Sequence, residues 1–174
     1  MFARHSLLRA AVISAFALFL APSLATVPAA AKTITFRATG APFPINLPNN
    51  WRVKDIERGV EISSSDREVR FWVEAIDTGN VDAVVNNYFK SFRQQGVKMR
   101  LPMTQRKDVF GGVDVILMDI PSIYDGNTTI IRMLITNPRP QERKGLFIAY
   151  WASPKADRKY DETVTDIIMD LLRP

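Results

Sequence analysis

The sequence has no cysteine, and its one histidine is His5, near the amino terminus. The absence of thiols excludes disulfides, thiolate nucleophiles, sulfur metal ligands and attachment of a lipid to a cysteine. Beyond the amino-terminal segment there is no imidazole either, which excludes serine–histidine and cysteine–histidine catalysis and metal sites with nitrogen ligands. Carboxylate, arginine, hydroxyl and aromatic groups remain as the chemistry open to this chain.

The amino-terminal segment has the pattern of a cleavable secretory signal peptide. An apolar run over residues 10–21 follows the basic start and is shorter than the about 20 residues that a membrane-spanning helix needs. Small residues at Ala29 and Ala31 place the cleavage before Lys32, and an earlier site after Ala25 stays open. The basic residues that precede the run are Arg4, His5 and Arg9.

We therefore expect residues 1–31 to be removed and residues 32–174 to form a single periplasmic or secreted domain without a transmembrane span. The whole chain has 23 Lys and Arg against 18 Asp and Glu; without Arg4 and Arg9 the counts are 21 and 18, so the net charge falls from +5 to +3. Because this net positive charge is small and the chain is expected to be exported, we expect no nucleic-acid partner. We also expect no cofactor and no metal.

The alternation of apolar and polar residues predicts strands over most of the chain. Residues 38–50 contain Gly40 and three prolines, which predict an irregular loop. Gly111-Gly112 and Asp125-Gly126 are typical of hairpin turns, so the strands should pair antiparallel. The expected strands cover Thr33–Arg37, Arg52–Ile56, Val60–Ser63, Glu68–Ile76, Met99–Val109, Val113–Ile120, Thr129–Thr136 and Leu146–Trp151.

Two segments have helical periodicity. The first covers about residues 81–95, with Asn80 as its N-cap and Gly96 just past its end. The second covers about residues 162–172, with Asp161 as its N-cap. These elements predict an α+β fold in which an antiparallel sheet of about six to seven strands packs with two main helices.

The order of elements resembles the PsbP-like α/β/α sandwich family, which includes DcrB-type bacterial envelope proteins. The local matches are a proline-bounded Phe43–Pro48 strand, its continuation Leu47-Pro48-Asn49-Asn50-Trp51, and the Tyr150–Pro154 strand exit before the last helix. The resemblance implies an α/β/α sandwich and a non-catalytic role in binding or assembly. DcrB-type proteins carry a lipidated cysteine, and this chain departs from them because it has none.

Arg70 and Arg132 each lie in the middle of a predicted strand among apolar neighbours. Burial of an unpaired guanidinium costs several kcal/mol, so each arginine needs a partner. Either they pair across strands with Glu74, Asp114 or Asp119, or they line a groove that binds an anionic ligand.

Aromatic and basic residues supply further candidates for a binding surface. Trp51 and Phe110 stand beside predicted turns and are expected to be partly exposed anchors. Basic residues gather in predicted loops and are compatible with an anionic membrane surface or cell-wall polymer. They are Arg106, Lys107, Arg139, Arg143, Lys144, Lys155, Arg158 and Lys159.

The sequence thus favours an exported non-enzymatic binding or assembly factor of the bacterial cell envelope. It does not identify the partner, for which an envelope protein and an anionic small ligand are both open. The alternative is a periplasmic protein that binds a small anionic ligand in an arginine-lined cleft. A carboxylate-based hydrolase is the third reading, because acidic residues bracket the predicted hairpin over residues 109–124. These acids are Asp108, Asp114, Asp119 and Asp125.

Overall fold

The computed structural model describes residues 31–38, 41–139 and 144–173, so the expected signal peptide lies outside the described residues apart from Ala31. In chain order the elements are β1 (Ala31–Ala38), β2 (Ala41–Pro48), β3 (Arg52–Ile56), β4 (Gly59–Ser63), β5 (Val69–Asp77), the 3₁₀ turn η1 (Thr78–Asn80), α1 (Val81–Gln94), β6 (Lys98–Met99), β7 (Thr104–Phe110), β8 (Val113–Tyr124), β9 (Asn127–Arg139), β10 (Lys144–Ala152) and α2 (Pro154–Leu172).

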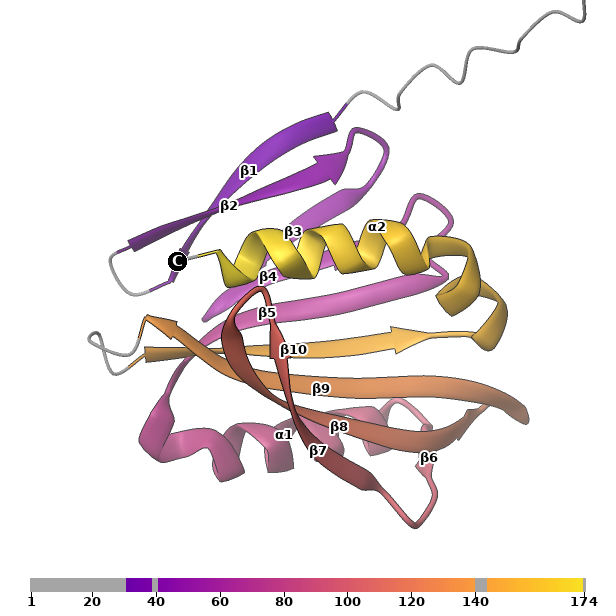
Figure 1. Cartoon of the computed structure of the whole chain (residues 1–174). Coiled ribbons are helices and arrows are strands. Elements are labelled where there is room, and N and C mark those ends of the chain that lie inside the picture. Colours follow the sequence, from indigo (N-terminus) through magenta and orange to yellow (C-terminus); the bar gives the residue numbers. More distant parts are fainter. Residues whose placement is uncertain (1–30, 39–40, 140–143, 174) are drawn as a thin grey trace, which may run out of the picture.

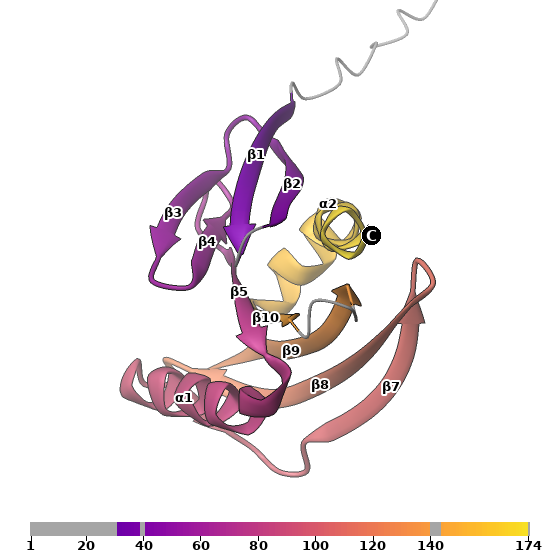
Figure 2. The same ribbon diagram turned by 90° about the vertical axis from the view of Figure 1, so that its left-hand side faces the viewer.

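Eight of the described strands form one antiparallel sheet in the order β3-β4-β5-β10-β9-β8-β6, and β7 also pairs with β8. The strands β1 and β2 form a separate hairpin. Figure 1 shows α1 on one side of the sheet and α2 on the other. The view along the strands in Figure 2 shows the sheet bent around α2, with the β1–β2 hairpin beside that helix. The expected α+β sandwich is therefore confirmed, and its main sheet has eight strands where the sequence indicated six or seven.

The central strands β5 and β10 are covered on both faces. Along β5, Phe71 and Val73 belong to the cluster of buried side chains on the α2 side, and Ile76 belongs to the cluster on the α1 side. Along β10, Ile148 faces α2 and Phe147 faces α1. Apolar residues at consecutive positions are the pattern of a strand buried on both faces, which is what the sequence of β5 predicts.

The irregular loop expected over residues 38–50 is wrong, because residues 41–48 form the strand β2, which pairs with β1. The Phe43–Pro48 strand implied by the family resemblance is confirmed, since it lies within β2. The prolines of β2 have even residue numbers. At these positions the backbone nitrogen is on the side of the strand that faces away from β1. Asn46, also at an even position, shows this direction because its N–H donates to the Asp170 carboxylate of α2 at 3.3 Å. A proline whose N–H would point away from its partner strand removes no bond from the ladder. The prolines are Pro42, Pro44 and Pro48.

The last helix begins eight residues earlier than its apolar periodicity predicts, at Pro154 instead of Glu162. The N-cap is Ser153, whose hydroxyl accepts from the Ala156 N–H at 3.1 Å, and Asp161 lies inside the helix. Proline suits the first turn of a helix because it has no N–H to leave unsatisfied. In the described segments neither helix has the length and apolar character of a membrane span.

The expected strand over residues 99–109 is divided in the structure. β6 pairs with β8 at Met99↔Ser122, and β7 begins at Thr104 after a bend that contains Pro102. The first helix is close to its expected bounds, and Gly96 follows it with a φ of 90°. Its N-cap residue Asn80 makes no side-chain capping bond.

The two helix starts form a matched test of capping. Ser153→Ala removes the hydroxyl that accepts from Ala156, so we expect it to lower the free energy of unfolding by about 1 kcal/mol. Asn80→Ala removes a side chain that makes no capping bond, and its effect should stay within about 0.5 kcal/mol. Urea denaturation measures both, and equal effects of the two substitutions would contradict the assigned caps.

Candidate functional site

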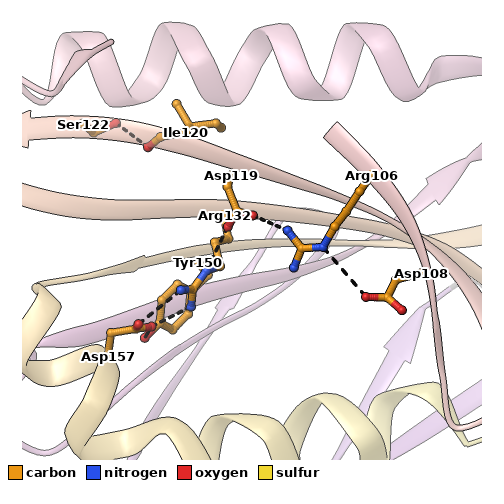
Figure 3. Close-up of polar contacts among 8 residues, drawn as sticks. All are labelled: Arg106, Asp108, Asp119, Ile120, Ser122, Arg132, Tyr150 and Asp157. Atoms are coloured by element: carbon orange, nitrogen blue, oxygen red, sulfur yellow. Dashed lines mark hydrogen bonds and ion pairs between the residues drawn. The ribbon is translucent and has the colours of Figure 1, made fainter. Parts of the chain in front are cut away.

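The arginine in the middle of β9, Arg132, is held by acidic residues from the sheet and from α2. Its Nε donates to Asp119 of β8 at 3.1 Å, and its two terminal nitrogens donate to the two oxygens of Asp157 at 2.6 and 3.2 Å. The guanidinium also lies 5.7 Å from the centre of the Tyr150 ring. Figure 3 shows it between the two carboxylates, with the tyrosine ring alongside.

The electrostatics of this cluster favour a charged arginine. Burial alone would lower the pKa of Arg132, but the hydrogen bonds and the negative charge of Asp157, together with Asp119, raise it above its usual value. Burial and the Asp157 charge raise the pKa of Tyr150, whose hydroxyl donates to Asp157 at 2.9 Å. Of the two roles expected for Arg132, an ion pair within the protein or a contact to an anionic ligand, the structure shows the ion pair. Asp119 is an expected partner, whereas Asp157 lies in the part of α2 that the periodicity missed.

The cluster continues to the edge of the sheet through Arg106 of β7. This residue donates to Asp119 and lies 3.8 Å from Asp108, as Figure 3 shows. Asp108 and Asp119 are therefore both engaged by arginine on the α2 side of the sheet. In the residues that the structure describes, no group of three or more His, Cys, Asp or Glu could hold a metal ion.

The other candidate arginine, Arg70, lines a cavity of about 360 Å³ at one end of the strands, which we call the Arg70 pocket. Arg70 has neither an ion pair nor a side-chain hydrogen bond with any other described residue, and its side chain is half-buried. The β4–β5 turn, the β8–β9 turn and the ends of α1 and β10 form the walls. The lining residues are Arg67, Glu68, Arg70, Gln95, Tyr124, Asp125, Asn127, Thr128, Thr129, Trp151 and Ser153.

An aromatic pair forms one wall of the Arg70 pocket. Trp151 lies directly opposite Arg70 in the β5–β10 pairing, and Tyr124 meets it edge-on with ring centres 5.0 Å apart. The indole N–H donates to the Thr129 hydroxyl at 2.7 Å, and that hydroxyl donates to the Ala152 carbonyl at 2.9 Å. These bonds fix the indole ring, while the Tyr124 side chain is 43% exposed at the rim.

The turn that carries Arg67 is fixed by its own polar contacts. Arg67 has a φ of 62°, and its N–H donates to the Ser64 carbonyl at 3.0 Å. Beside it, Asp66 accepts from Lys159 at 2.8 Å and from Tyr160 at 2.7 Å, both on α2. The hydrogen bond from Lys159, followed by that from Ser64, holds the pKa of Asp66 well below its usual range. The turn is thereby joined to α2.

Two guanidinium groups, Arg67 and Arg70, thus border one half-open cavity beside an aromatic wall. Glu68 and Asp125 also line it, yet within the described chain neither carboxylate lies within 4 Å of either guanidinium. A guanidinium presents paired N–H donors that match the oxygens of a carboxylate or phosphate. This arrangement is suited to bind an anionic group.

The two candidate aromatic anchors are not exposed in the way the sequence suggested. Trp51 is only 3% exposed because it packs against Phe71 and Tyr160, so the expectation of a partly exposed anchor is wrong for this residue. Phe110 is half-buried against the α2-side cluster. The exposed aromatic residue of the site is Tyr124. Its exposure could have been predicted from the sequence, because it directly precedes the Asp125-Gly126 turn.

The expectation that the basic clusters lie in loops is wrong for most of them. Arg106 and Lys107 are in β7, the cluster over residues 155–159 is in α2, and Arg139 and Lys144 end β9 and begin β10. Arg143 lies outside the described residues. Ion pairs engage Arg106 and Lys159, which reduces the charge that these clusters offer to an anionic surface.

No family model and no curated protein matches this sequence. The fold matches the solution structure of the cyanobacterial PsbP protein (CyanoP) from Synechocystis sp. PCC 6803, with a TM-score of 0.52, 10% identity, and coverage of 87% of this chain and 96% of that chain. The chain has a PsbP-like fold. The crystal structure of PA94, a Pseudomonas aeruginosa protein of unknown function, is less similar: its TM-score is 0.39 and its identity 11%, with coverage of 79% of this chain and 94% of that chain.

This result confirms the resemblance found in the sequence at the level of fold. At 10% identity the PsbP-like similarity shows the fold alone and carries no site residue to this chain.

The contrast between the two arginines gives a stability test. Arg132→Lys keeps the charge but loses the fork that joins Asp119 and Asp157, so we expect the free energy of unfolding to fall by about 1–3 kcal/mol. Arg70→Lys breaks no ion pair among the described residues and should cost less than about 0.5 kcal/mol. Chemical denaturation measures the free energy of unfolding of both variants. Equal losses of stability would contradict the different environments assigned to Arg132 and Arg70.

The Asp66 contacts give a pH test. A carboxyl whose folded pKa is depressed contributes stability above its unfolded pKa, about 3.9, and that contribution is lost as the pH falls below it. We expect Asp66→Asn to be less stable than wild type at pH 7 and the gap to shrink as the pH falls from about 5 towards 2. Denaturation across this range measures the gap. Lys159→Met should behave in the same way, whereas parallel pH curves would contradict the assignment.

Proposed function

We propose that this chain is a non-enzymatic binding or assembly factor that works in the cell envelope after export, and that it holds an anionic group of its partner in the Arg70 pocket. The observation that carries the proposal is the half-buried guanidinium of Arg70, which has no acidic partner among the described residues and lines a cavity.

The comparison with Arg132 supports this choice of site. Both arginines stand on central strands of one sheet, and the protein supplies two carboxylates to Arg132. Arg70 instead faces a half-open cavity, where its donors are free for a group from outside. A charge-assisted, bidentate bond between arginine and an oxyanion is among the stronger polar contacts in proteins.

The proposal commits to a carboxylate from an envelope protein, either an acidic side chain or a carboxyl terminus. The cavity of about 360 Å³ is at the small end of ligand sites and accepts one or two side chains. The exposed ring of Tyr124 supports a protein partner, because tyrosine and arginine are enriched where interfaces bind tightly. A small anionic ligand is the alternative, and it would use the same chemistry.

A carboxylate-based hydrolase is less well supported. General acid–base catalysis needs carboxyl groups that converge on one point. Asp119 is held by Arg106 and Arg132 on the α2 side of the sheet, while Asp125 lies at the far end of β8 in the Arg70 pocket. This separation favours binding over catalysis.

The test is native mass spectrometry of the protein purified gently from an envelope extract. We expect the wild-type protein to carry a bound species, which Arg70→Gln should lose. Arg93→Gln is the matched control, since it makes the same substitution at an exposed position of α1 that does not line the pocket. A co-purifying polypeptide supports the assembly factor, and a small-molecule mass supports the alternative ligand.

Two results would overturn the proposed site. In the first, the bound species remains at its wild-type level in Arg70→Gln. In the second, Arg93→Gln loses it to the same extent, which would indicate a general effect of surface charge. Circular dichroism of each variant confirms that the substitution has left the fold intact.

A further inference from the structure

A second cavity, also of about 360 Å³, lies at the opposite end of the strands from the Arg70 pocket. We call it the Asp114 pocket. It is bounded by the start of β8, the ends of β5 and β9, and the middle of β7. The apolar and polar residues used below are Ile76, Lys107, Asp114, Ile116, Ile135 and Asn137. Asp108 also lines the cavity, and its carboxylate lies 3.8 Å from the Arg106 guanidinium.

The strand register places these residues in two neighbouring rows on the α1 side of the sheet. In the first row Lys107 of β7 lies opposite Ile116 of β8, which lies opposite Ile135 of β9. In the next row Asp114 is two residues before Ile116, and Asn137 is two residues after Ile135. Side chains two residues apart on a strand point to the same face. The two isoleucines thus lie between the Lys107 ammonium in their own row and the polar side chains of Asp114 and Asn137 in the next row.

The apolar part forms the floor. Ile76 is buried in the α1-side cluster, and Ile135 packs against the same cluster from the sheet. Ile116 and Ile135 are half-buried, so the cavity leaves part of their aliphatic surface open to solvent. An aliphatic group that covers this surface is stabilised by the apolar area that it removes from water.

The polar part presents groups of opposite charge that are not used by the fold. Asp114 and Lys107 form no ion pair with any described residue, and the register makes them diagonal neighbours, about 7–8 Å apart. The Asn137 side-chain oxygen is buried and has no hydrogen-bond donor in the described part of the chain. A buried acceptor without a donor costs free energy that a bound N–H group recovers.

We propose that the Asp114 pocket binds a zwitterionic amino acid with an aliphatic side chain. Its ammonium group donates to the Asp114 carboxylate and to the Asn137 oxygen. Its carboxylate pairs with the Lys107 ammonium. Its side chain covers the Ile116 and Ile135 floor, so the ligand satisfies both charges and the unpaired acceptor at once.

Simpler ligands satisfy only part of this arrangement. An alkylamine leaves Lys107 unpaired and brings a second positive charge close to it. An aliphatic carboxylate leaves Asp114 and the Asn137 oxygen without a donor. An acidic amino acid adds a negative charge over the isoleucine floor. The site therefore distinguishes leucine from each of these compounds.

The experiment titrates the purified chain, labelled with ¹⁵N, with four probes: L-leucine, isopentylamine, 4-methylpentanoate and L-aspartate. We expect L-leucine to shift the amide signals of Ile116 and Ile135 in a saturable way. The other three probes should bind about tenfold more weakly or worse, since each loses at least one charged contact or the apolar one.

Two variants locate the site. Asp114→Asn should weaken leucine binding about tenfold, because it removes the charge that holds the ammonium group. Asp161→Asn is the matched control: it makes the same substitution at an exposed position of α2 that does not line the pocket, and it should leave leucine binding unchanged.

The titration of the wild-type chain decides even if a variant fails to fold. The proposal is overturned if L-leucine produces no saturable shift, if its shifts fall on residues of the Arg70 pocket, or if isopentylamine binds as tightly as leucine. The last result would mean that Lys107 contributes nothing to recognition.

Discussion

The pairing of β5 with β10 is the contact on which the rest of the structure depends. These strands lie in the centre of the sheet, and each contributes side chains to the buried clusters on both faces. Both helices pack against this sheet: α1 contacts β5, and α2 contacts β5, β9 and β10 as well as β2 of the hairpin. The same pairing sets Trp151 opposite Arg70, so the arrangement of the core and that of the Arg70 pocket have one origin.

The fold was predictable wherever a local pattern decides the structure. Alternating apolar residues, the Gly-Gly and Asp-Gly turns and the stripe of α1 each depend on neighbours in the sequence. The predictions were wrong for elements whose structure depends on contacts with residues far away in the sequence. The β2 prolines are tolerated because β1 lies on one side only, as the Asn46 N–H directed at Asp170 shows. The early turns of α2 have few apolar residues and are positioned by Asp157 and Ser153 instead.

The candidate site was predictable only in part, for the same reason. Sequence indicates that an arginine in the middle of a strand needs a partner, but it does not say which. Arg132 pairs with Asp119 because the register of β8 and β9 places them opposite each other. Its second partner, Asp157, lies in the first turns of α2, which the apolar periodicity did not predict to be helical. Arg70 found a cavity, because its neighbours across the sheet are Ser63 and Trp151, neither of which is acidic. Trp51 stands beside a turn, which suggests exposure, but Tyr160 of α2, more than one hundred residues later in the chain, packs against its ring and buries it.

The walls of the Arg70 pocket come from parts of the chain that are far apart in sequence, which has a consequence for folding kinetics. The β8–β9 hairpin closes a short loop, whereas β5 and β10 are separated in the sequence by residues 78–143. Contacts between distant segments form slowly because they close long loops. The pocket therefore exists only after this late step, and nascent or partly folded chains lack it. A partner that recognises it would select completed molecules and shift the folding equilibrium towards them.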